Sequence, residues 1–182
     1  MEVANNETCR HRPFILLLIG IPGSGKSHFA SRLESESNEQ IVRVNQDTLG
    51  SLKRCIAVAR AALQVVDAPG KKTTSIIVID RCNFNNQQRQ LWIDLANEMT
   101  VDCECVIFDY ATDACITRCQ QRTNHETIHP CDAVKVVSKM AKLFRPPTSG
   151  EKYKRLSRVT SFQEADALAD RYLARVRQHD LG

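Results

Sequence analysis

The chain lacks any apolar run long enough to cross a bilayer, and its first 13 residues are too polar to contain the hydrophobic region of a secretory signal. Internal repeats and low-complexity linkers are absent as well. The lack of a long apolar run excludes a transmembrane protein, and the lack of a secretory signal predicts an intracellular protein, in the nucleus or the cytoplasm. For 182 residues we expect a polar segment at 1–13 and one folded domain at 14–182, acting as a monomer.

A large excess of charge of either sign is also missing. The chain has 25 Lys and Arg residues against 21 Asp and Glu residues, which gives a formal net charge of +4. This small excess is compatible with an anionic substrate, and it is equally compatible with an ordinary protein surface. Charge alone therefore does not establish a nucleic-acid partner.

The eight cysteines form no framework that would indicate disulfides or a zinc site. The pairs with notable spacing are Cys103 with Cys105, Cys115 with Cys119, and His125 with His129. The first pair shares one face of an expected strand, and the other pairs do not combine into one set of four ligands. We therefore expect reduced thiols and no structural zinc.

Strand-like and helix-like segments alternate along the chain. Apolar, often β-branched runs predict strands at 14–19, 41–44, 75–79, 103–108 and 156–160. Helical periodicity predicts helices at 26–35, 48–66, 86–99, 112–122 and 132–144, and a capping box at Ser161 and Glu164 begins a C-terminal helix. Strands that are apolar throughout are buried on both faces, so the pattern predicts an α/β fold. We expect a central parallel sheet of four to five strands, flanked by helices.

In a sheet of this kind, ligands bind at the carboxyl ends of the strands. Gly20, Asp47, Asp80 and Asp109 each fall where an expected strand ends. The sequence therefore predicts that three acidic residues and a glycine loop lie along one rim of the sheet.

The glycine loop is the segment GIPGSGKS, from Gly20 to Ser27, which matches the pattern G-x-x-x-x-G-K-[ST] and lies between a buried strand and a helix. Backbone amides and a helix N-terminus in this arrangement bind the phosphates of a nucleoside triphosphate, and Ser27 is the expected ligand of Mg²⁺. The residues expected to bind the nucleotide are Gly20, Pro22, Gly23, Ser24, Gly25, Lys26 and Ser27.

Two classes of nucleotide-binding protein fit this loop less well. Asp47 to Gly50 spell the D-x-x-G of GTPase switches, but the N-K-x-D that reads guanine is absent. A large motor or an AAA-type ATPase needs a longer chain. The remaining class is a compact phosphotransferase.

Asp47 follows the second expected strand, and a helix is expected to begin directly behind it. At that rim a carboxylate faces the phosphate loop and is placed to take a proton from an acceptor hydroxyl. Asp is also a favoured residue for capping a helix N-terminus. Both roles are compatible with the sequence.

Three segments, GIPGSGKS, VNQDTLGSLKRC and VIDRCNFNNQQR, together resemble the kinase domain of polynucleotide 5′-hydroxyl kinases, such as the animal polynucleotide kinase/phosphatases. The third segment also resembles P-loop kinase domains that are fused to aprataxin-like modules. The similarity covers roughly residues 14 to 125. It implies a P-loop kinase fold with a helical lid, ATP as phosphate donor, Mg²⁺, and a 5′-hydroxyl end of DNA or RNA as acceptor, in nucleic-acid repair or end processing.

The resemblance also implies roles for single residues. Asp47 matches the general base, Asp80 lies near the metal with Ser27, and two lid arginines four residues apart match Arg118 and Arg122, which would bind the transferring phosphate together with Lys26. The alternative is that these two arginines are ordinary surface residues of an exposed helix and do not bind phosphate.

Two departures from the family concern the acceptor. Gln46 stands where the animal enzymes have an arginine, and Gly50 stands where some phage and bacterial relatives have one. Contacts with the acceptor strand must then come from elsewhere. The residues expected to make them are Lys53, Arg54, Arg81 and Asn83, and the basic segment 142–158 either follows a phosphate backbone or flanks the adenine.

Other functions stay open. A kinase for a nucleoside, a sugar or an antibiotic would share the loop, the base and the lid, and a nucleotide-binding module without catalysis would share the loop. Phosphatase D-x-D-G-T, ligase lysine and H-x-H-x-H motifs are absent from the chain. The kinase segment is therefore either a stand-alone enzyme or one module of a larger protein.

Overall fold

A parallel sheet forms the centre of the molecule, which we describe from a computed structural model covering residues 13–64, 74–121 and 129–178. Its strands are β1 (Phe14–Ile19), β2 (Ile41–Asn45), β3 (Ile76–Asp80), β4 (Asp102–Phe108) and β5 (Arg155–Val159). They lie in the order β2-β3-β1-β4-β5, and each neighbouring pair is parallel. The predicted parallel sheet, including its fifth strand, is confirmed.

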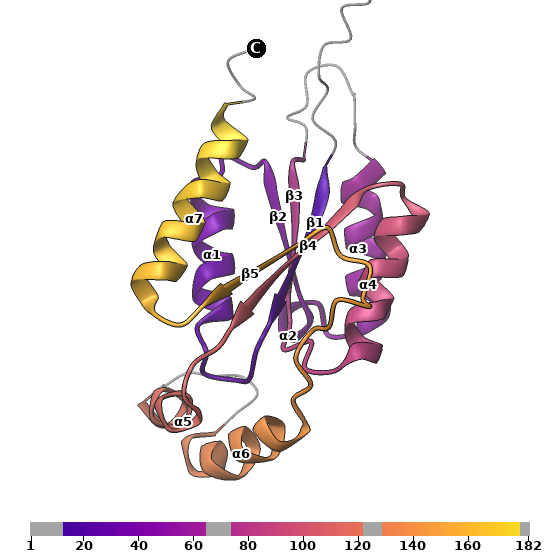
Figure 1. The fold of residues 1–182 in the computed structure, drawn as a ribbon. Helices are drawn as coiled ribbons and strands as arrows, with labels where there is room; N and C mark the ends of the chain where they lie inside the picture. The colour runs from indigo at the N-terminus through magenta and orange to yellow at the C-terminus, as the bar shows by residue number, and fades with distance from the viewer. Residues whose placement is uncertain (1–12, 65–73, 122–128, 179–182) are drawn as a thin grey trace, which may run out of the picture.

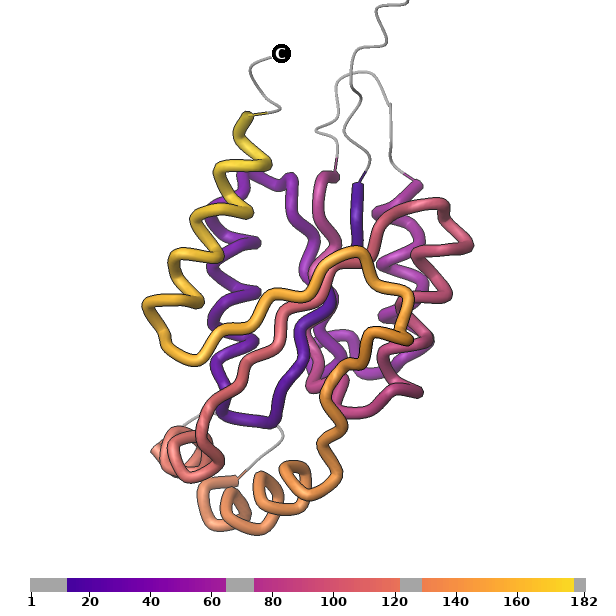
Figure 2. Tube along the Cα trace, in the orientation of Figure 1, coloured from indigo at the N-terminus to yellow at the C-terminus, as the bar shows by residue number. Residues whose placement is uncertain are grey.

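Helices cover both faces of this sheet (Figure 1). On one face lie α1 (Lys26–Glu36) and α7 (Phe162–Arg177), and on the other lie α3 (Leu52–Gln64) and α4 (Asn86–Glu98). At the carboxyl ends of the strands are α2 (Gln46–Leu49), α5 (Thr112–Gln121), a short 3₁₀ turn (Pro130–Asp132) and α6 (Ala133–Leu143). The tube in Figure 2 shows α5 and α6 at the end of the molecule where the chain turns from β1 into α1. None of the helices among the described residues is long and apolar enough to span a membrane.

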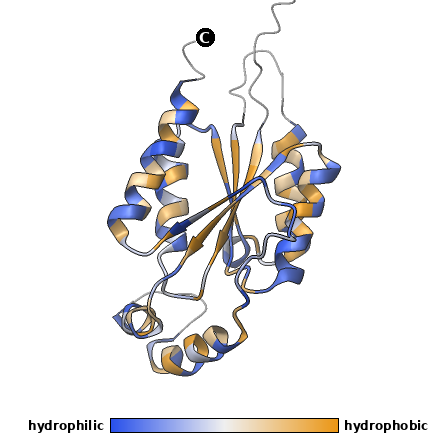
Figure 3. Ribbon diagram, in the orientation of Figure 1, coloured by the Kyte–Doolittle hydropathy of each residue, from blue (hydrophilic) through white to orange (hydrophobic). Residues whose placement is uncertain are grey.

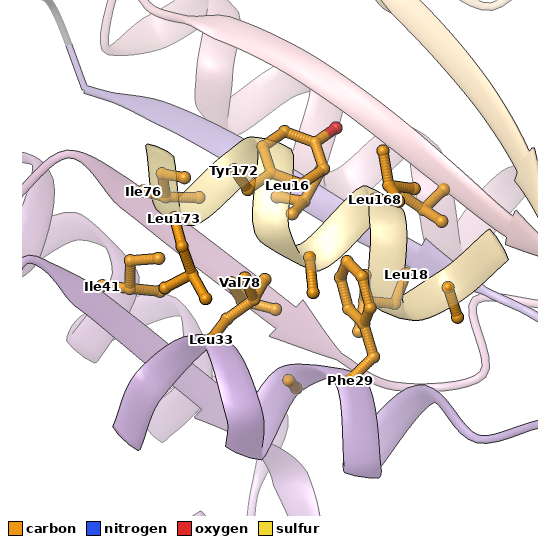
Figure 4. Packing of buried hydrophobic residues seen from close by; sticks show 14 of the residues in the cluster. Leu16, Leu18, Phe29, Leu33, Ile41, Ile76, Val78, Leu168, Tyr172 and Leu173 are labelled. Atoms are coloured by element: carbon orange, nitrogen blue, oxygen red, sulfur yellow. The ribbon is translucent and has the colours of Figure 1, made fainter. Parts of the chain in front are cut away.

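The two cores follow from the alternation of side chains along a strand. Phe14, Leu16 and Leu18 pack with α1 and α7, where Phe29 of α1 and Tyr172 of α7 meet them (Figure 4). The intervening residues of β1 pack with α3 and α4 instead. Every residue of β1 is buried, and in Figure 3 β1 has the hydrophobic colour, whereas the helices are mixed. This double burial explains why β1 reads as a continuous apolar run.

The helix predicted over 48–66 is divided into two. Gly50 adopts φ 75° and ends α2 after one turn, and α3 begins two residues later. The left-handed conformation is one that glycine adopts without steric cost, so Gly50 fixes the direction change. Residues 65 and 66 lie outside the described part of the chain.

A buried ion pair fixes the segment that returns from α6 to β5. Arg89 Nε and Nη2 donate to the two carboxylate oxygens of Glu151 at 2.7 Å each, and both side chains are almost fully buried. Arg89 Nη1 also donates to the carbonyls of Asn83 and Arg145. The segment between α6 and β5 is thereby tied to the segment that follows β3, and α6 is held at the carboxyl ends of the strands.

Candidate functional site

The loop from Gly20 to Ser27 joins β1 to α1 as the sequence predicted. Gly25 caps α1 with φ 92°, so the free amides of the first helical turn point toward the loop. The amino group of Lys26 donates to the carbonyl of Ile21 at 2.8 Å and to Ser24 Oγ at 3.2 Å, and only 5% of Lys26 is exposed. A helix N-terminus and a buried ammonium together make a site for an anion such as a phosphate group.

Gly23 holds this loop directly against α5. A Cβ atom at this position would lie 2.3 Å from the carbonyl oxygen of Cys115, and Gly23 has φ 82°. No side chain fits there, because the contact is with backbone. The loop and α5 are therefore in van der Waals contact, and α5 is placed beside the phosphate-binding amides.

Asp80, at the end of β3, is the centre of a hydrogen-bond network. Its Oδ1 accepts from Ser27 Oγ at 3.1 Å. Its Oδ2 accepts from Arg43 Nη2 at 2.6 Å, from Arg43 Nε at 2.9 Å and from Asn45 Nδ2 at 2.8 Å. One carboxylate oxygen is thus fully occupied by donors, while the other lies beside a serine hydroxyl. This pair of oxygens fits the ligand preference of Mg²⁺.

Arg43 is a member of this network that the sequence did not indicate. It lies on β2, its third nitrogen donates to Ser31 Oγ on α1 at 2.8 Å, and its side chain is 21% exposed. Asp80 is 2% exposed at the side chain. Arg43 therefore neutralises a buried carboxylate and links β2, β3 and α1 behind the phosphate loop.

We expect the substitution Arg43→Met to destabilise the protein by about 3 kcal/mol, because it leaves the buried carboxylate of Asp80 without its ion-pair partner. Added Mg²⁺ is expected to restore part of this loss, since a cation beside Asp80 replaces the missing positive charge. Thermal melting with and without Mg²⁺ measures both effects. The double variant Arg43→Met/Asp80→Asn is the control and should melt above Arg43→Met alone. Equal melting of Arg43→Met and the parent protein would contradict the role of Arg43.

A cavity of about 350 Å³ opens at the carboxyl ends of the strands. It is lined by the phosphate loop, by α2, by the segment that follows β3 and by α6. Lys26, Asp47 and Asp80 all line it, as does Arg81. The apolar side is formed in part by Met140 of α6. The predicted rim of the sheet is thus a concave site with a cationic, an acidic and an apolar part.

Asp47 lies in the first turn of α2, is exposed, and does not cap that helix. The cap is Asn45, whose Oδ1 accepts from the backbone N–H of Thr48 at 3.1 Å. The interpretation of Asp47 as a helix cap was therefore wrong, because the helix begins at Gln46, two residues earlier than predicted. Asn45 both caps α2 and donates to Asp80, so it holds the position of Asp47 relative to the corner formed by Asp80 and Ser27.

Arg118 of α5 lies over the phosphate loop. Its Nη1 donates to the carbonyl of Gly23 at 3.4 Å, and its guanidinium carbon lies 4.7 Å from the ring centre of Tyr110 and 4.3 Å from that of Phe162. Two aromatic rings thus hold the cation beside the loop through cation–π contacts. Arg122, the second expected lid arginine, lies outside the described residues.

The four residues expected to contact an acceptor strand have different places. Arg81 lines the cavity. Lys53 and Arg54 are exposed on the first turn of α3, and the described residues that line the cavity do not include them. Asn83 is fully buried, and its Nδ2 donates to the carbonyl of Leu18 at 2.8 Å. A direct contact of Asn83 with a polynucleotide is therefore ruled out by burial, and its side chain anchors β1 instead.

Two further expectations concern Asp109 and the basic segment 142–158. Asp109 does lie at the end of β4, but it pairs with Arg158 at 2.7 Å and is not among the described residues of the cavity wall. In the basic segment 142–158, Lys154 pairs with Asp102 at 2.5 Å.

Cys103 and Cys105 are buried in one core, as their strand spacing predicted. Among the described residues, no group of three potential metal ligands occurs.

Comparison with known proteins places this geometry in a family. A family model described as "AAA domain" (AAA_33) matches residues 15–147. Transcription factor bHLH140 of Arabidopsis thaliana is 29% identical over 172 residues, which are 91% of this chain and 18% of that protein. The bifunctional polynucleotide phosphatase/kinase of Schizosaccharomyces pombe is 39% identical over 93 residues, 50% of this chain and 20% of that protein. The chain thus spans about a fifth of either relative.

Solved structures share the fold at low sequence identity. A fungal RNA kinase has a TM-score of 0.64 and 14% identity, with 93% of this chain and 84% of that chain covered. Kti12 of Chaetomium thermophilum, in complex with ADP-AlF3, has a TM-score of 0.63 and 15% identity, with 87% and 96% covered. A gluconokinase of Sinorhizobium meliloti 1021 has a TM-score of 0.56 and 13% identity, with 93% and 96% covered. The chain therefore has the fold of P-loop kinases.

Proposed function

The chain belongs to the AAA_33 family of P-loop kinase domains, and on that premise we propose that it transfers the γ-phosphate of ATP to the 5′-hydroxyl end of DNA or RNA. The observation that carries the proposal is the cavity in which Lys26, Ser27, Asp47 and Asp80 meet. A phosphate-binding cation, an oxygen pair suited to Mg²⁺ and an exposed carboxylate are what phosphoryl transfer to a hydroxyl needs. The local similarity to a polynucleotide phosphatase/kinase supports a polynucleotide as the acceptor.

Each residue would have one role in the transfer. The acceptor oxygen forms a bond to the γ-phosphorus, the bond from that phosphorus to the β,γ-bridging oxygen breaks, and ADP leaves. Asp47 accepts the proton of the hydroxyl. Lys26 and Arg118 stabilise the negative charge on the transferring phosphate from two sides. Ser27 and Asp80 would hold Mg²⁺, which neutralises phosphate charge when bound.

A small-molecule acceptor is the second candidate, and one observation favours it. The cavity is partly apolar, with Phe84, Val136 and Met140 in its wall, and its volume of about 350 Å³ suits a compact substrate. The gluconokinase with the same fold belongs to this class.

A transfer assay separates the two candidates. Purified protein is incubated with γ-labelled ATP and Mg²⁺, and with either a 5′-hydroxyl oligonucleotide, its 5′-phosphorylated counterpart, a nucleoside or gluconate. The proposal expects label on the 5′-hydroxyl oligonucleotide and none on the 5′-phosphorylated one. Label on the nucleoside or gluconate only would replace the proposal with a small-molecule kinase, and ATP binding without any transfer would indicate a module that has lost catalysis.

We expect Arg118→Ala to lower the turnover of phosphate transfer by roughly 10²–10³, the usual cost of removing one donor to a transition state. Stability should change by only about 0.5–1 kcal/mol, because the cation–π contacts with Tyr110 and Phe162 are partly exposed. Arg118→Lys is the matched control, since it keeps the charge but loses the planar fork. Steady-state kinetics measure the turnover, and a thermal melt measures the stability. Unchanged turnover in both variants would show that Arg118 is an ordinary surface arginine without a catalytic role.

A further inference from the structure

Helix α6 carries a row of three lysines on its outer face. Lys135, Lys139 and Lys142 are spaced by four and three residues, so they lie on one side of the helix and extend over about 10 Å along its axis. All three are exposed. The helix sequence AVKVVSKMAKL contains no acidic residue. We call these three residues the lysine row.

The other sides of α6 connect the lysine row to the candidate site. Ala133 and Val137 are buried against α5, on the side of the helix opposite the lysines. Val136 and Met140 line the cavity that also contains Asp47 and Lys26. One helix thus forms a wall of the cavity and presents three positive charges to solvent on its outer face. Figure 1 shows α6 at the foot of the molecule.

The charges of the lysine row are not neutralised by the part of the protein that the structure describes. Arg158, an exposed cation near the carboxyl end of β5, has an acidic partner there, because it pairs with Asp109. No ion pair between described residues involves a lysine of the row. Like charges one turn apart also repel each other and weaken the helix. An anionic partner that lies along α6 would remove this repulsion.

We propose that the lysine row binds the phosphates of the acceptor strand that follow its 5′ end, while the end itself enters the cavity. This inference rests on the proposed function and names the surface on which the rest of the polynucleotide lies. A polynucleotide is the anionic partner that reaches both the cavity and the outer face of the helix that lines it. Contacts of this type are independent of base sequence and sensitive to salt, because each bound phosphate releases counterions.

The test compares two double variants with the same change in net charge. Lys135→Gln/Lys139→Gln removes two charges of the row, and Arg171→Gln/Arg177→Gln removes two exposed charges of α7, on the flank of the sheet (Figure 1). The acceptors are a 5′-hydroxyl single strand of twenty nucleotides and a nucleoside 3′-phosphate. Two measurements are made: the ratio of kcat/KM for the long acceptor to that for the short one, and binding of the fluorescent long strand at several salt concentrations.

We expect the variant of the lysine row to lower the long-to-short ratio severalfold and to reduce the slope of log affinity against log salt by about 1.4, or about 0.7 for each lost contact with a single strand. The α7 variant should leave both quantities at the parent's values. Equal ratios and slopes in the two variants would overturn the inference while leaving the proposed function in place. A parent protein that phosphorylates only the nucleoside 3′-phosphate, or no 5′-hydroxyl at all, would overturn the proposed function and this inference with it.

Discussion

Replacement of Lys26 by alanine is expected to abolish phosphate transfer while the protein remains folded. The ammonium of Lys26 is buried in the phosphate loop, where it lies between the carbonyl of Ile21 and Ser24 Oγ. An ammonium in that position is expected to stabilise the transferring phosphate more than one neutral hydrogen-bond donor does. Removal of one such donor lowers the rate by roughly 10²–10³. The expected loss therefore exceeds that range.

The fold should tolerate this change because the loop is held by other contacts. Gly23 packs on the backbone of α5, and the φ of 92° at Gly25 places the start of α1, independently of the lysine side chain. The assay is phosphate transfer from labelled ATP, with ATP binding followed by calorimetry and folding by a thermal melt. Lys152→Ala, which removes an exposed lysine away from the cavity, is the control. Near-parental turnover of Lys26→Ala would show that the loop does not bind the reacting phosphates.

Much of the fold could be predicted from the sequence because burial leaves a clear signal in composition. β1 is buried on both faces, so it contains no polar residue between Phe14 and Ile19. The glycines and Lys26 of the loop are fixed by local backbone geometry and by neighbours close in sequence. Local causes of this kind act within a few residues, and a pattern of residue types can show them.

The parts of the site that were missed depend on contacts between distant segments. Arg43 reaches Asp80, which is 37 positions further along the chain. Its role depends on the pairing of β2 with β3, in which Asn45 and Asp80 are register partners. Met140 lines the cavity because the ion pair of Arg89 with Glu151, 62 positions apart, holds the segment behind α6 in place. No spacing within one element shows such contacts.

Asn83 and Gly50 were misjudged for a different reason, namely that polar and flexible residues have several common roles. Asn83 has φ 45° and turns the chain after β3, so its amide faces the backbone of β1 and not solvent. Gly50 ends a one-turn helix that was expected to continue. An asparagine in a segment rich in Asn and Gln is usually exposed, and only the course of the backbone after β3 shows that this one is buried.

Asp47→Asn is expected to yield a stable protein that has lost most of its transferase activity. The carboxamide has nearly the same size as the carboxylate, and α2 keeps its cap because Asn45, and not Asp47, accepts the hydrogen bond from Thr48. Asp47 is exposed, so the substitution buries no new polar group. A carboxamide does not accept a proton from the acceptor hydroxyl, and the loss of a general base costs on the order of 10²–10⁴ in rate.

Binding of ATP should survive in this variant, because the phosphate loop, Lys26 and the pair of Ser27 with Asp80 do not depend on Asp47. The melting temperature should therefore rise with ATP and Mg²⁺ by the same amount in Asp47→Asn as in the parent. Asp94→Asn, on the exposed side of α4, controls for the loss of one negative charge. If Asp47→Asn transferred phosphate at a rate near the parent's, Asp47 would not be the base, and the carboxylate in the first turn of α2 would only shape the wall of the cavity.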